Sequence, residues 1–350
     1  MVGRVSVPAP RGGGNATAPA APRLAHIAAQ AKVSEATASR VLNGKAGVAA
    51  GTRQRVLAAL DVLGYERPVR LKQRSAGLIG LLTPELTNPI FPAFAQVIEQ
   101  TLAGHGYTPL LCTQIPGGAT EDELVEQLVE RGVDGIVFLS GLHSDLSSDP
   151  ARYEALTARS VPYVLVNGYN EAVTAPFVST DDRAAAQMAV THLRELGHIR
   201  VGLAVGPVRY VPSHRKREGF IEATGSADLI QHTLFSVEGG QAAAGSLLDA
   251  GCTGVVCGSD MMALGVIRAA RDRGLRVPED VSVVGYDDSP LTPFTDPPLT
   301  TVRQPVQAMA TAAVGALLEE IRGSAVAVGR TEFVFQPELV VRGSTGQVRA

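Results

Sequence analysis

A short polar segment, residues 34–43, has side chains suited to reading the edges of DNA bases. The guanidinium of Arg40 can donate two hydrogen bonds to a guanine, and the carboxylate of Glu35 can accept one from a cytosine amino group. Short hydroxyl side chains in the same segment suit contacts with phosphate oxygens, which position a protein on DNA. The candidate DNA-contacting residues of this segment are Ser34, Glu35, Ala36, Thr37, Ser39, Arg40 and Asn43.

Two short helices are predicted to position these side chains. The first runs from about Leu24 to Gln30, with apolar residues at helical spacing on one face. The second begins after Ser34, whose hydroxyl is a good N-cap, and ends at Leu42. Small alanine side chains where the helices cross allow the close approach that a helix-turn-helix requires. The outer face of the second helix would then present Glu35, Ala36, Ser39 and Arg40 to base edges.

The sequence of residues 33–65, VSEATASRVLNGKAGVAAGTRQRVLAALDVLGY, resembles the DNA-binding headpiece of the lactose-repressor (LacI/GalR) family of bacterial regulators. That family has AGVSxATVSRVLNG followed by VSxxTRxRVxxAxxxLGY. This chain departs from it at His26, at Ala38 and at Lys32, which replaces the turn glycine and is expected at a positive φ. None of these departures removes a base-reading position. The resemblance implies sequence-specific DNA binding by residues 23–65 and adds Arg53 to the DNA contacts.

Charge is divided unevenly along the chain. Residues 23–74 hold ten Lys and Arg against three acidic residues, whereas residues 75–350 hold 19 basic and 31 acidic residues. A basic module attached to an acidic body indicates a polyanionic partner for the module alone. The basic segment coincides with the predicted helix-turn-helix, so double-stranded DNA is the expected partner.

Residues 66–76 correspond to the hinge of the same family but are shorter than that hinge by about four residues. In the family, a leucine of the hinge helix wedges into the minor groove. Leu71 stands at the matching distance, eight residues before Ile79, and is flanked by Arg70 and Lys72. The resemblance therefore implies a minor-groove wedge at Leu71. The alternative is a flexible basic linker that contains a leucine by chance.

From Gly77 onward, short apolar segments alternate with segments of helical periodicity, and this series occurs twice. Such alternation predicts parallel, doubly wound sheets, and two rounds predict two similar subdomains. The segment resembles the periplasmic-binding-protein-like core of the same family. The expected fold is therefore a small all-α helix-turn-helix headpiece plus an α/β core of two doubly wound parallel-sheet subdomains. The expected boundaries are a disordered tail at 1–22, an N-subdomain at about 77–169 and 304–328, and a C-subdomain at about 170–303 and 329–345.

Polar and aromatic residues that follow the predicted strands are candidates for binding a small effector. Ligands of open α/β sheets lie beyond the carboxyl ends of the strands, and sugars require acceptors for hydroxyls and an apolar face for the ring. The alternative is that such a residue caps the N-terminus of the helix that follows it. At Asp181 and Asp260 this capping role is expected as much as effector binding. At residue 216 the family has arginine, and lysine lacks its planar fork. The candidates are Asn88, Phe91, Asn167, Tyr210, Lys216, Ser259, Asp260 and Asp287.

Enzymatic motifs are missing from the sequence. No GxGxxG follows the first strand, and no GxxxxGK[ST], HExxH or nucleophile elbow occurs. Three scattered cysteines fit reduced thiols, and the spacing of Cys252 and Cys257 fits no zinc pattern. We therefore expect no enzymatic activity, no cofactor and no metal. An α/β enzyme and a periplasmic solute-binding protein remain as alternatives. The missing motifs disfavour the enzyme, and the basic headpiece and the lack of a signal peptide in residues 1–22 disfavour the solute-binding protein.

The resemblance implies a cytoplasmic, nucleoid-associated bacterial regulator, most simply a repressor. A homodimer would bind a pseudopalindromic operator, because a two-fold protein matches a two-fold site. A small effector, a sugar or sugar derivative, would shift the lobes and with them the spacing of the headpieces. No stretch approaches the roughly 18 apolar residues that a membrane span requires, so no membrane partner is expected.

Overall fold

The computed structural model describes residues 24–43, 45, 47–65, 76–114, 117–323 and 331–348. It divides into two compact units, residues 1–74 and 75–350, which are considered separately below. The predicted tail and the hinge residue Leu71 lie outside the described residues. No described helix is both long enough and apolar enough to span a bilayer.

The first unit contains the predicted helix-turn-helix and a third helix. Helix α1 spans Leu24–Ala31, α2 spans Glu35–Leu42 and α3 spans Ala50–Val62. Ser34 caps α2 as predicted, because its Oγ accepts a hydrogen bond from the Thr37 amide at 3.2 Å. Lys32 lies in the turn at φ 53°, as expected for a residue in place of glycine. The buried core consists of Ile27, Ala28, Ala31, Ala38, Val41, Val56, Ala59 and Leu60.

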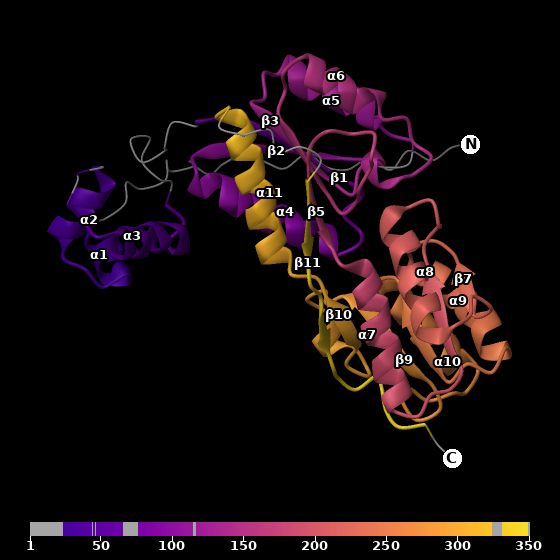
Figure 1. Cartoon of the computed structure of the whole chain (residues 1–350). Helices are drawn as coiled ribbons and strands as arrows, with labels where there is room; N and C mark the ends of the chain where they lie inside the picture. The colour runs from indigo at the N-terminus through magenta and orange to yellow at the C-terminus, as the bar shows by residue number, and fades with distance from the viewer. Residues whose placement is uncertain are drawn as a thin grey trace, which may run out of the picture. The chain divides into compact units, whose positions relative to one another are not determined.

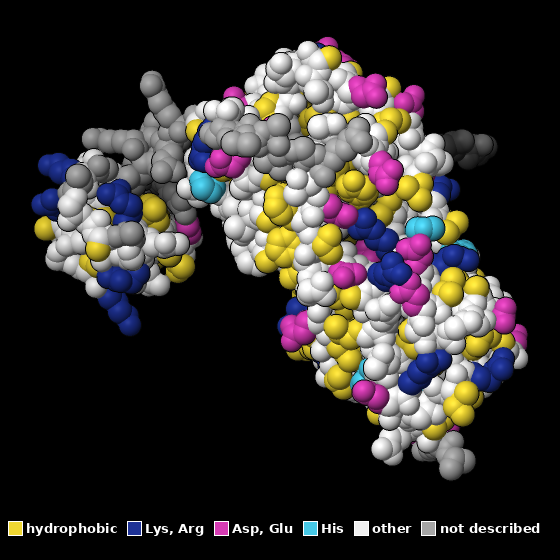
Figure 2. Space-filling view, in the orientation of Figure 1, with side chains coloured by type: hydrophobic (Ala, Val, Ile, Leu, Met, Phe, Trp, Pro, Cys, Tyr) yellow, Lys and Arg dark blue, Asp and Glu magenta, His cyan; other side chains and the backbone are white. Residues whose placement is uncertain are grey.

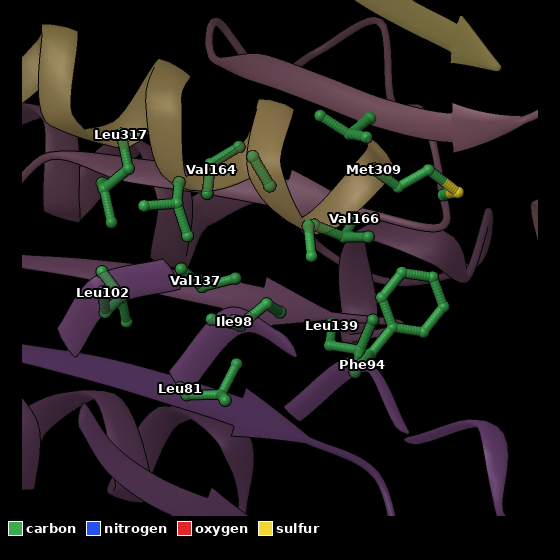
Figure 3. Packing of buried hydrophobic residues seen from close by; sticks show 14 of the residues in the cluster. Leu81, Phe94, Ile98, Leu102, Val137, Leu139, Val164, Val166, Met309 and Leu317 are labelled. Atoms are coloured by element: carbon green, nitrogen blue, oxygen red, sulfur yellow. The ribbon is translucent and has the colours of Figure 1, made fainter. Parts of the chain in front are cut away.

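The N-terminal lobe of the second unit is built on a six-stranded parallel sheet (Figure 1). Its strand order is β11-β5-β4-β3-β1-β2. Helices α4 and α11 cover one face, where their side chains pack against β1, β3 and β4 (Figure 3). Helices α5 and α6 pack on the other face. The bounds are β1 Gly77–Thr83, α4 Ile90–Gly104, β2 Tyr107–Thr113, α5 Glu121–Glu130, β3 Gly135–Leu139, η2 Leu142–Ser144, α6 Ala151–Ala158, β4 Tyr163–Val166, β5 Pro176–Thr180, α11 Val306–Ile321 and β11 Thr331–Phe335.

The C-terminal lobe repeats this design with strand order β12-β10-β9-β8-β6-β7, in which only the β10–β12 pair is antiparallel. Helices α9 and α10 pack on one face, and α7 and α8 pack on the other. The predicted fold class is thereby confirmed. The bounds are α7 Asp182–Glu195, β6 Val201–Val205, α8 Val211–Thr224, β7 Ile230–His232, α9 Val237–Asp249, β8 Gly254–Cys257, α10 Asp260–Asp272, β9 Ser282–Asp287, η3 Thr292–Phe294, β10 Thr300–Arg303 and β12 Glu338–Val340.

The strands β5 and β11 correct the predicted subdomain boundaries. Both had been assigned to the C-subdomain, but β5 pairs with β4 and with β11 in the N-terminal sheet. The chain therefore passes between the sheets after β5, between β10 and α11, and between β11 and β12, rather than at residues 168–171 and 329–330. A fully buried parallel strand such as β5 has the same apolar pattern in either sheet, and the largely exposed edge strand β11 has no buried residues that would indicate its sheet. The sequence pattern therefore could not assign either strand.

Gly240 lets α9 and α10 approach closely. A Cβ placed on Gly240 would overlap the backbone carbonyl of Met262 in α10, whereas a Cβ on Gly245 of the same helix would meet only the mobile end of Arg273 at 3.7 Å. The two glycines therefore differ in the space around them, although both lie in one helix.

We expect Gly240→Ala to lower the free energy of unfolding by roughly 1–3 kcal/mol, because the added methyl forces the two helices apart. Gly245→Ala is the matched control, and it should be neutral or stabilising by up to about 1 kcal/mol through helix propensity. Urea denaturation of the two variants measures the difference. Equal stabilisation by both substitutions would contradict the close approach.

Candidate functional sites

The outer face of α2 presents the predicted base-reading side chains together. Glu35, Ala36 and Arg40 are exposed, whereas Ala38 and Val41 on the opposite face are buried in the headpiece core. The visible face of the headpiece carries several Lys and Arg side chains and few acidic ones (Figure 2). The helix is therefore amphipathic, and the headpiece that carries it has the positive charge that approach to a DNA groove requires.

Polar groups around α2 also stabilise the headpiece itself. Ser34 Oγ lies 2.9 Å from the hydroxyl of Thr37, and Asn43 Nδ2 donates to the Ser39 carbonyl at 2.9 Å. Arg53 donates from Nη2 to the Lys45 carbonyl at 3.2 Å and so ties α3 to the loop after α2. Their predicted DNA contacts must therefore coexist with these bonds within the headpiece.

In the second unit, Asn88 and Asp287 lie together although they come from different lobes. Asp287 ends β9, and its Oδ1 accepts a hydrogen bond from Gln304 Nε2 at 2.7 Å. The Asn88 side chain also hydrogen-bonds to this carboxylate. Gln304 Oε1 in turn accepts from Thr180 Oγ1 at 3.0 Å. Burial, and then the neighbouring charge of Asp260, raise the pKa of Asp287 well above its ordinary value.

The turn after β9 holds Asp287 in place. Asp287 has φ 119° and Asp288 has φ 57°, a conformation that side-chain-bearing residues rarely adopt. The Asp288 carboxylate accepts from Arg303 Nε and from Arg342 Nη2, each at 2.7 Å. Two guanidinium groups thus stabilise the turn that places the Asp287 side chain at the contact between the two lobes, called the joint below.

Ser259 and Asp260 have structural partners within the C-terminal lobe. Ser259 caps α10 by accepting from the Met262 amide. Asp260 Oδ1 accepts from Thr301 Oγ1 at 2.6 Å, and Oδ2 accepts from the Ser289 amide at 2.7 Å. Burial raises the pKa of Asp260 to about 6. Asp260 therefore anchors the segment after Asp287, and its two oxygens are both engaged.

Asp181 has the capping role that was the alternative to effector binding. It is the N-cap of α7, and its Oδ1 accepts from the Ala184 amide at 2.9 Å.

Lys216 is placed differently from its predicted role. Its ammonium group forms an ion pair with Asp182 of α7 and lies 3.6 Å from the centre of the Tyr286 ring. Tyr286 also donates to Asp182 at 2.7 Å. The side chains of Lys216 and Asp182 are 7% and 6% exposed. Lys216 lies on α8, which packs against α7, so its ammonium group pairs with a buried carboxylate inside the lobe. Its position does not support the prediction that it binds an effector.

Tyr210 lies beside an aromatic residue that the sequence analysis missed. The ring centroids of Tyr210 and Phe235 are 6.2 Å apart, and the Phe235 ring lies where a side chain at Gly206 would stand. Arg209 lies over Tyr210, 4.8 Å from its ring centre, and donates to its hydroxyl at 3.0 Å. The signal for Phe235 was an aromatic residue in the short loop that follows β7, directly before the Ser236 cap of α9.

The two remaining candidates lie at the ends of N-terminal-lobe elements. Phe91, in the first turn of α4, is half-buried and packs against the hydrophobic core of that lobe. Asn167 follows β4 at φ 64°, and its backbone N–H donates to the Val178 carbonyl at 2.9 Å. Across the described ranges, no group of three or more His, Cys, Asp and Glu side chains is arranged to hold a metal ion.

Two family models match the chain. Residues 23–67 match the model of bacterial regulatory proteins of the lacI family, and residues 190–345 match that of a periplasmic binding protein-like domain. An HTH-type transcriptional regulator from the aml 5′ region of Streptomyces limosus is 72% identical over 98% of this chain and 99% of its own length. The HTH-type transcriptional repressor CytR of Escherichia coli is 34% identical over 91% and 95% of the two chains.

Solved structures also match nearly the whole chain. The transcriptional regulator CelR in complex with cellobiose has a TM-score of 0.68 and 31% identity, over 93% of this chain and 100% of the other. The lac repressor dimer bound to its operator and the anti-inducer ONPF has a TM-score of 0.68 and 27% identity, over 91% and 98%. The headpiece, the two-lobed core and these relatives agree: this chain belongs to the LacI family of bacterial transcriptional regulators.

Proposed function

We propose that this regulator represses transcription as a homodimer on a pseudopalindromic operator, in the cytoplasm at the nucleoid. The observation that carries its DNA binding is the exposed outer face of α2, a capped helix that presents Glu35 and Arg40 and belongs to a basic headpiece. The lac repressor is a dimer in its operator complex, and a two-fold dimer of this chain would match a two-fold operator. Sedimentation of the full chain with and without operator DNA tests the dimer.

We propose that a sugar is the effector and that it binds between the lobes. Asp287 and Asn88 provide acceptors and donors for adjacent hydroxyls, and Tyr210 with Phe235 provides the aromatic face. A sugar would replace the hydrogen bonds that Asn88 and Gln304 now make with Asp287. Such a replacement changes the joint between the lobes, so the ligand binds the two lobe arrangements with different affinities.

Arg40 is expected to read a base. Arg40→Ala should weaken binding to the selected operator by roughly 1–3 kcal/mol and relax the preference at one position in each half-site. Arg55→Ala, on α3, removes the same charge and serves as the control. Gel retardation on operator and on random DNA separates the effects. An equal loss on both DNAs for Arg40→Ala would make Arg40 a phosphate contact only.

The proposed wedge at Leu71 has a separate test. Leu71→Ala should weaken operator binding measurably, yet less than Arg40→Ala does, because a shortened hinge leaves a smaller wedge and a milder bend. Operators with one central base pair inserted or deleted give the second measurement. If Leu71→Ala is silent and all three spacings bind equally, residues 66–76 are a plain linker.

Asp287 is expected to recognise the effector. Asp287→Asn keeps the size and tolerates the positive φ, but it replaces one carboxyl oxygen with an amide nitrogen that cannot accept, so effector binding should weaken at least about tenfold while operator binding without effector stays nearly unchanged. Titration calorimetry with ribose, cellobiose and its α-linked isomer maltose measures binding. Unchanged sugar affinity in Asp287→Asn would place the pocket elsewhere. Phe235→Ala gives an independent test of the aromatic face, whereas Phe91→Ala would also disturb core packing.

A further inference from the structure

Two loops from opposite lobes meet at one point beside Tyr210. The loop after β3 carries Asp145, and the loop after β6 carries Arg209; Arg209 Nε donates to Asp145 Oδ2 at 2.8 Å. The Leu146 amide donates to the Arg209 carbonyl at 2.8 Å, and Asp145 pairs with Tyr210 as an isolated antiparallel bridge. One ion pair and one stretch of backbone pairing therefore join the lobes here.

This contact lies away from the strands through which the chain passes between the lobes. In the first sheet, β4 separates β3 from the crossing strand β5. In the second sheet, β8 and β9 separate β6 from the crossing strand β10. A contact at this distance from the crossings acts on the side where two hinged lobes would part.

The Asp145 side of the contact is rigid. Ser147 donates to Asp145 Oδ1 from its amide at 2.9 Å and from its hydroxyl at 2.6 Å. Burial opposes ionisation, but the two bonds from Ser147 and the guanidinium of Arg209 hold the pKa of Asp145 below its ordinary value. Its side chain is 10% exposed, whereas that of Arg209 is 53% exposed. The carboxylate is thus a fixed acceptor for a more mobile guanidinium.

A buried carboxylate fastens this loop to its own lobe. Glu121, at the start of α5, accepts from Tyr153 Oη at 2.8 Å and from the Leu142 amide at 2.9 Å. Tyr153 Oη in turn accepts from the His143 amide at 2.9 Å. Because the loop is held within the N-terminal lobe, pulling on Asp145 moves the lobe as a body.

We propose that the Asp145–Arg209 pair is an interlobe latch that sets how often the lobes part, and hence how fast an effector enters and leaves. The entry of an effector rests on the proposed function, whereas the opening of the lobes does not. A partly exposed ion pair is weak, so the latch opens reversibly without any ligand. Arg209 also stacks on Tyr210, so latch opening frees the aromatic face proposed to meet the sugar.

The opening is measured on the full chain without effector. Spin labels at Glu130→Cys and Arg268→Cys, exposed positions on α5 and α10, report the distance between the lobes in a Cys112→Ser background. Arg209→Ala should raise the fraction with lengthened distances by about two- to fivefold. Arg276→Ala is the matched control, because it breaks a comparable pair with Asp280 within one lobe.

A double-mutant cycle identifies the partner. Asp145→Asn keeps the size of the side chain and should open the lobes as Arg209→Ala does, and the two changes together should add little, because each already breaks the same pair. Fully additive effects, or opening by Arg276→Ala to the same extent, would overturn the latch.

The consequence for binding is measured by stopped-flow mixing with whichever of ribose, cellobiose and maltose binds the unmodified protein. Both the association and the dissociation rate should rise in Arg209→Ala by about the factor seen in the distances, and unchanged rates would overturn the gating role. If none of these sugars binds, the proposed effector class fails, and the spin-label distances still decide the latch.

Discussion

The buried carboxylate of Asp287 is the point on which the two-lobed core depends. It ends a central strand of one lobe and accepts hydrogen bonds from Asn88 of the other lobe and from Gln304 at a chain crossing. A carboxylate removed from water is costly unless its acceptors are satisfied. The hydrogen bonds that satisfy it are also those that join the lobes, so a molecule that offers hydroxyl groups there changes the joint directly.

This placement is maintained at a conformational cost. Asp287 and Asp288 both have positive φ, which for non-glycine residues costs about 1–3 kcal/mol each. Arg303 and Arg342 bind the Asp288 carboxylate, and Asp260 binds the Ser289 amide just beyond it. The polar groups around the turn thus offset its strain. They also explain why Asp260, although close to Asp287, is engaged in supporting it.

The headpiece depends on different physics. Its core is formed by only a few large side chains with several alanines, and so small a module buries little apolar surface. Local bonds such as the Ser34 cap and the Arg53 bond to the Lys45 carbonyl therefore contribute a larger share of its stability. Residues that resemble DNA contacts in the sequence serve this local purpose as well.

The sequence by itself determined the helix-turn-helix, the two series of strands and helices, and the family. Helix caps, apolar periodicity and sequence motifs all depend on residues that are close together in the chain. It also predicted that Asn88 and Asp287 lie at strand ends. Tertiary structure alone decided which sheet β5 and β11 join, since a buried parallel strand such as β5 has the same pattern in either sheet and the edge strand β11 is largely exposed. It also decided that Lys216 faces Asp182 and Tyr286 inside a lobe, and that Asp145 meets Arg209, 64 residues away. Such pairings depend on how distant elements pack, and no local pattern records that packing.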